Sequence, residues 1–228
     1  MLNIDEIVTY TKARLQLYQL FSVLFNQQPS IELTQDFYKV FNPDTSLLLE
    51  SSPAFNEGMQ CLYTFSREVE AQEISEVTTS LNVEWLRLFR GIKPDYGLPP
   101  ARASAYITYD IHALREHYAS AGLKISHPQF EPDYAGVQLA FLYKLVSQEL
   151  QHWIVNNQQK ALKTLSQEND FTNEHLSWIS ELCHRGVEQA ETSFYRGVLL
   201  LLSEFLESEQ LWLVECSNTL YSLGSPGE

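Results

Sequence analysis

Apolar side chains recur every three or four residues along most of the chain, and no stretch alternates with a period of two. This spacing places apolar side chains on one face of a helix. It is clearest after Ser52 and Pro53, a capping hydroxyl and a proline suited to a first helical turn, where Phe55, Met59 and Leu62 follow at helical spacing. The pattern predicts helices over residues 4–25, 32–41, 53–72, 78–89, 106–121, 133–155, 173–190, 193–206 and from 208 onward.

Residues at the ends of these segments support the assignment. Gly91 and Gly122 follow two predicted helices as terminators, and Asp133 is a candidate cap for the helix after it. Five successive apolar residues at 198–202 leave their helix no polar face, which predicts a central position. The sequence therefore predicts an all-α fold, a single domain over residues 1–228 in which about nine to ten helices form a bundle.

Two segments, residues 91–101 and 122–132, do not follow the helical pattern and together contain five prolines. Both are long for connections between helices, and long ordered loops on a helical scaffold often carry function. We therefore expect them to be functional loops.

Charge and cysteine content restrict the partners and the compartment. The chain has 15 Lys and Arg against 29 Asp and Glu, a net charge of −14, which disfavours nucleic acid and suits a cationic partner. Three widely spaced cysteines indicate a reducing compartment. The first residues are acidic where a signal peptide is basic, and the longest apolar run is too short to span a bilayer. We expect a cytoplasmic protein without stable membrane insertion.

Two Glu-x-x-His repeats, Glu149 with His152 and Glu181 with His184, match the ligand pattern of di-iron helix bundles. They support the main alternative function, a di-metal helical-bundle oxidoreductase. On helical wheels, however, His152, Glu181 and His184 lie away from the apolar stripes, so we expect the candidate ligands to face outward and to bind no metal.

Other catalytic patterns are missing from the sequence. His112 and His117 are five residues apart, which turns them away from each other on a helix, and we expect both to be solvated. Neither a glycine-rich phosphate loop nor a serine nucleophile turn occurs. The sequence therefore offers no support for an ATP-driven enzyme or a serine hydrolase, and no cofactor is expected.

Three motifs at helix and loop junctions are more specific: EWLRLFRG at residues 84–91, LPPARASAY at 98–106 and EPDYAGVQLAFL at 131–142. With an N-terminal Tyr18…Phe25…Pro29 helix and a C-terminal His175-Leu-x-Trp178, they resemble the TorD/DmsD family, also grouped with NarJ. This family consists of cytoplasmic chaperones that mature molybdenum-cofactor reductases, enzymes of anaerobic respiration. The resemblance covers most of the chain.

The resemblance implies a helical chaperone, not an enzyme, that binds the twin-arginine leader of a reductase catalytic-subunit precursor and holds it until cofactor insertion and export. Monomer and homodimer, the identity of the client, and binding of a guanine nucleotide or of the molybdenum cofactor all stay open. The family's leader-binding positions map onto Glu84, Trp85, Leu88, Pro99, Pro100, Ser104, Tyr106, Glu131, Pro132, Asp133 and Tyr134.

The chemistry of the residues agrees with this implication. A twin-arginine leader presents two guanidinium groups and an apolar stretch, so its receptor needs carboxylates beside aromatic side chains. Glu131 and Asp133, next to Phe130 and Tyr134, supply both. We expect Asp133 to cap a helix and to accept from arginine at once. Tyr134 stands where the family usually has histidine, so no titrating imidazole is expected there.

A helical scaffold that binds an unrelated partner through its acidic surface is a further alternative.

Arg102 also departs from the family, several members of which have an aromatic residue at this position. Client choice is therefore not carried over from the resemblance.

Overall fold

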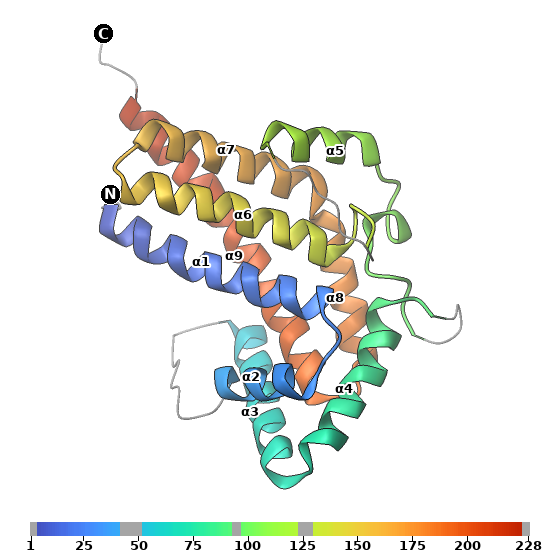
Figure 1. The fold of residues 1–228 in the computed structure, drawn as a ribbon. Coiled ribbons are helices and arrows are strands. Elements are labelled where there is room, and N and C mark those ends of the chain that lie inside the picture. The colour runs from blue at the N-terminus through green and yellow to red at the C-terminus, as the bar shows by residue number, and fades with distance from the viewer. Residues whose placement is uncertain (1–3, 42–51, 93–96, 123–129, 225–228) are drawn as a thin grey trace. The chain divides into compact units, whose positions relative to one another are not determined.

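The computed structural model describes residues 4–41, 52–92, 97–122 and 130–224, and in these ranges the chain is helical without strands (Figure 1). The prediction of an all-α fold is therefore confirmed. The helices are α1 (Ile4–Asn26), α2 (Ile31–Phe41), α3 (Pro53–Ala71), α4 (Ile74–Phe89), α5 (Ile111–Ser120), α6 (Ala135–Ile154), α7 (Gln158–His175), α8 (Ser177–Gln189) and α9 (Ser193–Gly224), with a short 3-10 helix, η1 (Ala103–Ala105).

Several of the predicted end signals are confirmed. The Ser52 hydroxyl accepts from the backbone N–H of Phe55 at 3.0 Å, and Pro53 opens α3. Gly91 and Gly122 follow α4 and α5 with φ of +59° and +71°, a left-handed conformation that glycine adopts without steric cost. Residues 93–96 and 123–129 of the two predicted loops lie outside the described residues.

Other boundaries differ from the prediction. Helix α4 begins at Ile74, before the predicted residue 78. Helix α5 begins only at Ile111, where the Asp110 side chain caps it by accepting from the backbone N–H groups of His112 and Ala113. Helix α7 was not predicted at all, and it extends over the predicted start of α8. Its buried positions include Thr164, Glu168 and Thr172, so polar residues on the inner face hide the helical period.

The predicted break before residue 208 is also wrong, because α9 continues through it. Ser208, the predicted start of a last helix, lies exposed within α9, and the next residue, Glu209, is fully buried. Within α9 residues 198–202 are all buried or half-buried, as the apolar run predicts.

The chain forms two compact units, each built from segments distant in sequence. Unit 1 comprises residues 1–26, 108–177 and 207–228, and unit 2 comprises residues 27–107 and 178–206. Helix α9 contributes its first part to unit 2 and its second part to unit 1. The single domain over residues 1–228 stays a prediction.

In unit 1, α6 lies between α1 and α7 (Figure 1). Twelve of its residues are buried, which marks α6 as the central helix of this unit. Within the described ranges, no helix is both long and apolar enough to cross a membrane.

Candidate functional sites

The first predicted site residues lie on α4 in unit 2 and are buried. Glu84, Trp85, Leu88 and Phe89 are each less than 5% exposed. Phe89 packs edge-on against Tyr195, with 5.5 Å between the ring centroids. Phe89 is therefore a core residue, and Trp85, predicted to contact a leader, is also buried.

Glu84 binds the backbone just before α9. Its two carboxylate oxygens accept from the N–H groups of Glu191 and Thr192 at 2.5 and 2.9 Å. Burial raises the pKa of the Glu84 carboxyl, while these hydrogen bonds favour its charged form. The negative charge also interacts favourably with the positive end of the helix dipole. In this structure Glu84 holds the turn between α8 and α9 in place.

The second group of predicted residues follows α4. The chain folds back along the end of this helix, where Leu98 N–H donates to the Arg87 carbonyl at 3.1 Å and Ala101 N–H to the Phe89 carbonyl at 2.9 Å. A Cβ atom on Gly97 would lie 2.1 Å from the Arg87 oxygen, so glycine is needed for this approach.

The same loop presents a partly exposed surface. Tyr106 packs on Trp178, with 5.4 Å between ring centroids, and the Arg185 guanidinium carbon lies 5.6 Å from the Tyr106 ring. Burial raises the pKa of the Tyr106 hydroxyl. Pro99, Pro100 and Tyr106 are half-buried and Ser104 is exposed. We name this surface, formed by residues 99, 100, 104 and 106, the proline loop surface.

The third group lies in unit 1 at the start of α6. Glu131 is exposed, whereas Asp133 and Tyr134 are buried. Phe130 stacks on Tyr134 with 4.3 Å between centroids, and the Tyr134 hydroxyl donates to the Phe25 carbonyl at 3.0 Å. Glu131 is therefore the accessible carboxylate of this segment.

The prediction that Asp133 caps α6 is wrong, because the helix begins two residues after Asp133. The residue in the N-cap position of α6 is Tyr134, and α6 begins at Ala135. Asp133 is fully buried one residue earlier, since the chain turns inward before the helix starts. Its carboxylate therefore does not face solvent.

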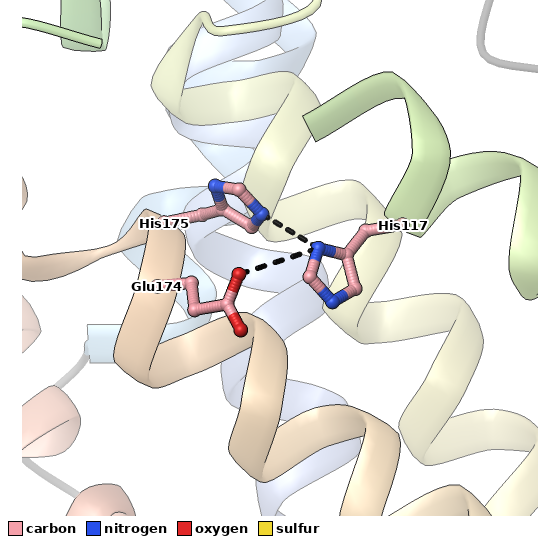
Figure 2. Close-up of side chains that lie close together, drawn as sticks. All are labelled: His117, Glu174 and His175. Carbon is pink, nitrogen blue, oxygen red and sulfur yellow. Dashed lines mark hydrogen bonds and ion pairs between the residues drawn. The ribbon is translucent and has the colours of Figure 1, made fainter. Parts of the chain in front are cut away.

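A histidine pair in unit 1 was missed by the sequence analysis. His117 on α5 lies beside His175 at the end of α7, with 2.8 Å between His117 Nδ1 and His175 Nε2 (Figure 2). The Tyr109 hydroxyl lies 2.9 Å from His175 Nδ1, and Gln138 Nε2 donates to the Tyr109 oxygen at 2.8 Å. His117 is therefore only partly solvated, unlike the expectation. The sequence does not reveal the pair, because the two histidines are 58 residues apart and only the packing of α5 in this unit brings them together.

The electrostatics of this pair follow from its burial. His175 is 3% exposed, and burial, together with the neighbouring His117, lowers the pKa of His175 to about 4. His175 is thus a neutral imidazole near pH 7, with a lone pair on one ring nitrogen. The Glu174 carboxylate completes the group, with Oε2 3.8 Å from His117 Nδ1 (Figure 2).

The Glu-x-x-His pairs do not form the predicted alternative metal site. Glu181 binds Arg185 at 2.6 Å, and His184 is exposed on the same helix. His152 is half-buried, but Glu149 is fully buried, so its expected outward position is wrong. Glu149 is tolerated in the interior because a buried partner from another helix pairs with its charge.

That partner is Arg14, which stands at the centre of a buried ionic cluster in unit 1. Its guanidinium donates to Glu149 at 2.6 Å, to both oxygens of Glu209 at 2.9 Å through Nε, and to Glu168. All four side chains are at most 1% exposed. Burial raises the pKa of Glu168, against the opposing effect of Arg14. A single cation thus faces three carboxylates from α6, α7 and α9.

Comparison with known families identifies the protein at the family level. A family model described as nitrate reductase delta subunit matches residues 50–184, more than half of the chain. No curated protein and no solved structure gives a significant match. The match includes the three motif segments described above and confirms the resemblance on which the sequence analysis relied. The chain belongs to the nitrate reductase delta subunit family, a family of molybdoenzyme maturation chaperones.

Proposed function

We propose that this protein is a cytoplasmic chaperone that binds the twin-arginine leader of a molybdenum-cofactor reductase precursor and holds the precursor until its cofactor is inserted. The observation that carries the proposal is the exposed Glu131 carboxylate, which lies in sequence between Phe130 and Tyr134, two residues whose rings stack. In this role the chain is a binding protein and not an enzyme.

The segment at residues 130–134 offers the chemistry that a leader needs. A guanidinium group donates two parallel hydrogen bonds to a carboxylate, which gives arginine an advantage over lysine. The partly buried Phe130 ring supplies an apolar contact beside that carboxylate. The net charge of −14 attracts a basic leader over longer distances.

The other predicted residues take different parts in the proposal. Asp133, Glu84, Trp85 and Leu88 are buried, so we assign them positioning roles behind the binding surfaces. The proline loop surface in unit 2 offers half-buried apolar groups and is a separate candidate for apolar contacts with a leader. Each surface is tested by variants of its own.

Calorimetric titration with a synthetic leader peptide tests the carboxylate. Glu131→Gln should weaken binding about tenfold, because a hydrogen bond to a charged group contributes roughly 1.5–3 kcal/mol once the peptide covers it. Glu116→Gln, an exposed carboxylate on α5, is the matched control and should bind as the unmodified protein does.

A second peptide in which both arginines are lysines closes a double-mutant cycle. It should bind the unmodified protein more weakly and lose little further affinity with Glu131→Gln. Equal losses in both proteins would place the guanidinium contact elsewhere. Tyr106→Ala tests the proline loop surface in the same assay, with Tyr38→Ala as control for loss of a partly exposed ring.

Asp133→Asn separates positioning from direct contact. We expect it to lower the melting temperature and to leave the difference between the arginine and lysine peptides unchanged. If Asp133→Asn instead abolishes that difference at unchanged stability, Asp133 and not Glu131 is the guanidinium acceptor.

A further inference from the structure

We propose that His117, Glu174 and His175 form a binding site for a divalent transition metal ion of the zinc type. The site lies within unit 1, where α5 provides His117 and the last turn of α7 provides the other two residues. It does not depend on the leader-binding proposal, since none of its residues belongs to the surfaces assigned to a leader.

The donor atoms already converge. One ligand atom from each residue lies within 4.8 Å of the others. Figure 2 shows the Glu174 carboxylate and the His175 ring directed at the same nitrogen of His117. The two measured separations from His117 Nδ1 are 2.8 Å to His175 Nε2 and 3.8 Å to Glu174 Oε2.

The ligand set suits zinc. Two imidazoles and one carboxylate are a common set of three protein ligands, which leaves a fourth position for water or an external ligand. Bonds of about 2.1 Å in a tetrahedron place ligand atoms about 3.4 Å apart. The histidines must therefore separate by roughly 0.6 Å and Glu174 must approach by roughly 0.4 Å. Both adjustments are available, because the side chains of His117 and Glu174 are 28% and 57% exposed.

A buried second layer orients His175. Histidine ligands usually bond a further group through the ring nitrogen that does not hold the metal, which fixes the ring. Here Tyr109 contacts Nδ1 of His175, and the fully buried Gln138 donates to the Tyr109 oxygen. This leaves Nε2 of His175 directed at His117 and Glu174.

Metal binding selects one tautomer of His175. Ligation through Nε2 places the proton on Nδ1, which then donates to the Tyr109 oxygen. That oxygen can accept this bond beside the one from Gln138 while the hydroxyl proton turns away. The 2.8 Å contact between the two histidines is a hydrogen bond without metal and is replaced by two metal–nitrogen bonds with it.

Competition titration with a chromogenic chelator at pH 7.5 tests the site on full-length protein stripped of metal. We expect one equivalent of Zn²⁺ to bind. His117→Ala should weaken this binding at least tenfold, and Glu174→Gln should weaken it less. Tyr109→Phe should weaken it about tenfold or more, as the loss of a second-layer partner usually does.

Two controls exclude general surface binding. His112→Ala removes an exposed histidine from the same helix, and His184→Ala removes an exposed histidine 3.7 Å from Glu188, an ordinary His–Glu pair. Both should bind Zn²⁺ as the unmodified protein does. Circular dichroism should show full helicity for all five variants, since none of the truncated side chains fills the core.

Co²⁺ gives an independent readout. A tetrahedral site with nitrogen ligands should give intense visible absorption bands, and His117→Ala should lose them. The proposal is overturned if the protein binds no Zn²⁺ equivalent, if His117→Ala binds as tightly as the unmodified protein, or if His184→Ala causes the same loss.

Discussion

Unit 1 contains two polar clusters that differ in their exposure to solvent: one is closed to solvent and the other is open. The Arg14 cluster draws its four charged side chains from four helices, and none of them is more than 1% exposed. The cluster of His117, Glu174 and His175 comes from two helices and keeps His117 and Glu174 partly in solvent. A closed cluster can only support the fold, whereas an open one can exchange protons and ligands with the surroundings.

Burying the charged side chains of the closed cluster carries a large electrostatic cost. Three buried carboxylates would repel one another strongly, and burying each charge costs several kcal/mol unless it is paired. Arg14 pairs with all three, and Thr11 and the Trp153 indole also donate to Glu149. The open cluster is neutral at its buried end, because His175 has lost its proton.

Arg14→Met should have the largest effect of any change considered. It leaves three buried carboxylates without a cation, and we expect a loss of about 3–5 kcal/mol in the free energy of unfolding. Urea denaturation of the variant measures it, with Lys12→Met, an exposed cation on the same helix, as control. A loss below 1 kcal/mol would show that the cluster is not an ionic centre of the fold.

The second largest effect should be on the pH dependence of stability, which differs between the two clusters because the pKa of His175 is lowered and that of Glu168 is raised. A lowered pKa makes the unfolded state bind more protons than the folded state, so the contribution of His175 is present above about pH 6.5 and lost as the pH falls towards 4. A pKa that drops from 6.5 to about 4 corresponds to roughly 3 kcal/mol.

Glu168 has the opposite sign, since its pKa is raised: its contribution is present below the unfolded value and declines as the pH rises above it. The contribution of His175 is the one that declines as the pH falls. In chelator-treated protein, His175→Gln should flatten the fall in unfolding free energy between pH 6.5 and 4. An unchanged slope in this variant would mean that His175 is not the titrating group.

Tyr109→Phe should have a smaller effect. It removes the hydroxyl between Gln138 and His175, both buried, and each unsatisfied polar group costs about 1–3 kcal/mol. Thermal and urea unfolding compare it with Tyr38→Phe, whose hydroxyl bonds Glu70 on the surface. Similar losses of unfolding free energy in the two variants would show that the buried hydrogen-bond network contributes no more to stability than a surface hydrogen bond.

Glu168→Gln should have the smallest effect. Because burial favours the neutral carboxyl at this position, an amide of the same shape should cost less than about 1 kcal/mol at pH 7. Glu209→Gln is the matched comparison, and it should cost roughly 1.5–3 kcal/mol, since Glu209 binds Arg14 through both oxygens and accepts from Tyr18. The reverse order would show that Arg14 depends more on Glu168 than on Glu209.

Local signals in the sequence predicted most of the helices. The Ser52-Pro53 start of α3 and the glycines after α4 and α5 act through their own backbone and immediate neighbours, so no tertiary knowledge is required to recognise them. Helix α7 escaped prediction because Glu168 and its polar neighbours occupy the buried face, where a periodicity argument expects apolar side chains. The sequence motifs also pointed to the family that the comparison confirms.

The sequence alone determined the helical class and the family, because both rest on periodicity and motifs carried by neighbouring residues. The tertiary structure decided which polar side chains are buried and which meet. Arg14 reaches Glu209 across 195 residues, and His117 reaches His175 across 58. A buried charge is tolerated only when a partner arrives from elsewhere in the chain, and that partner is set by packing, not by local sequence.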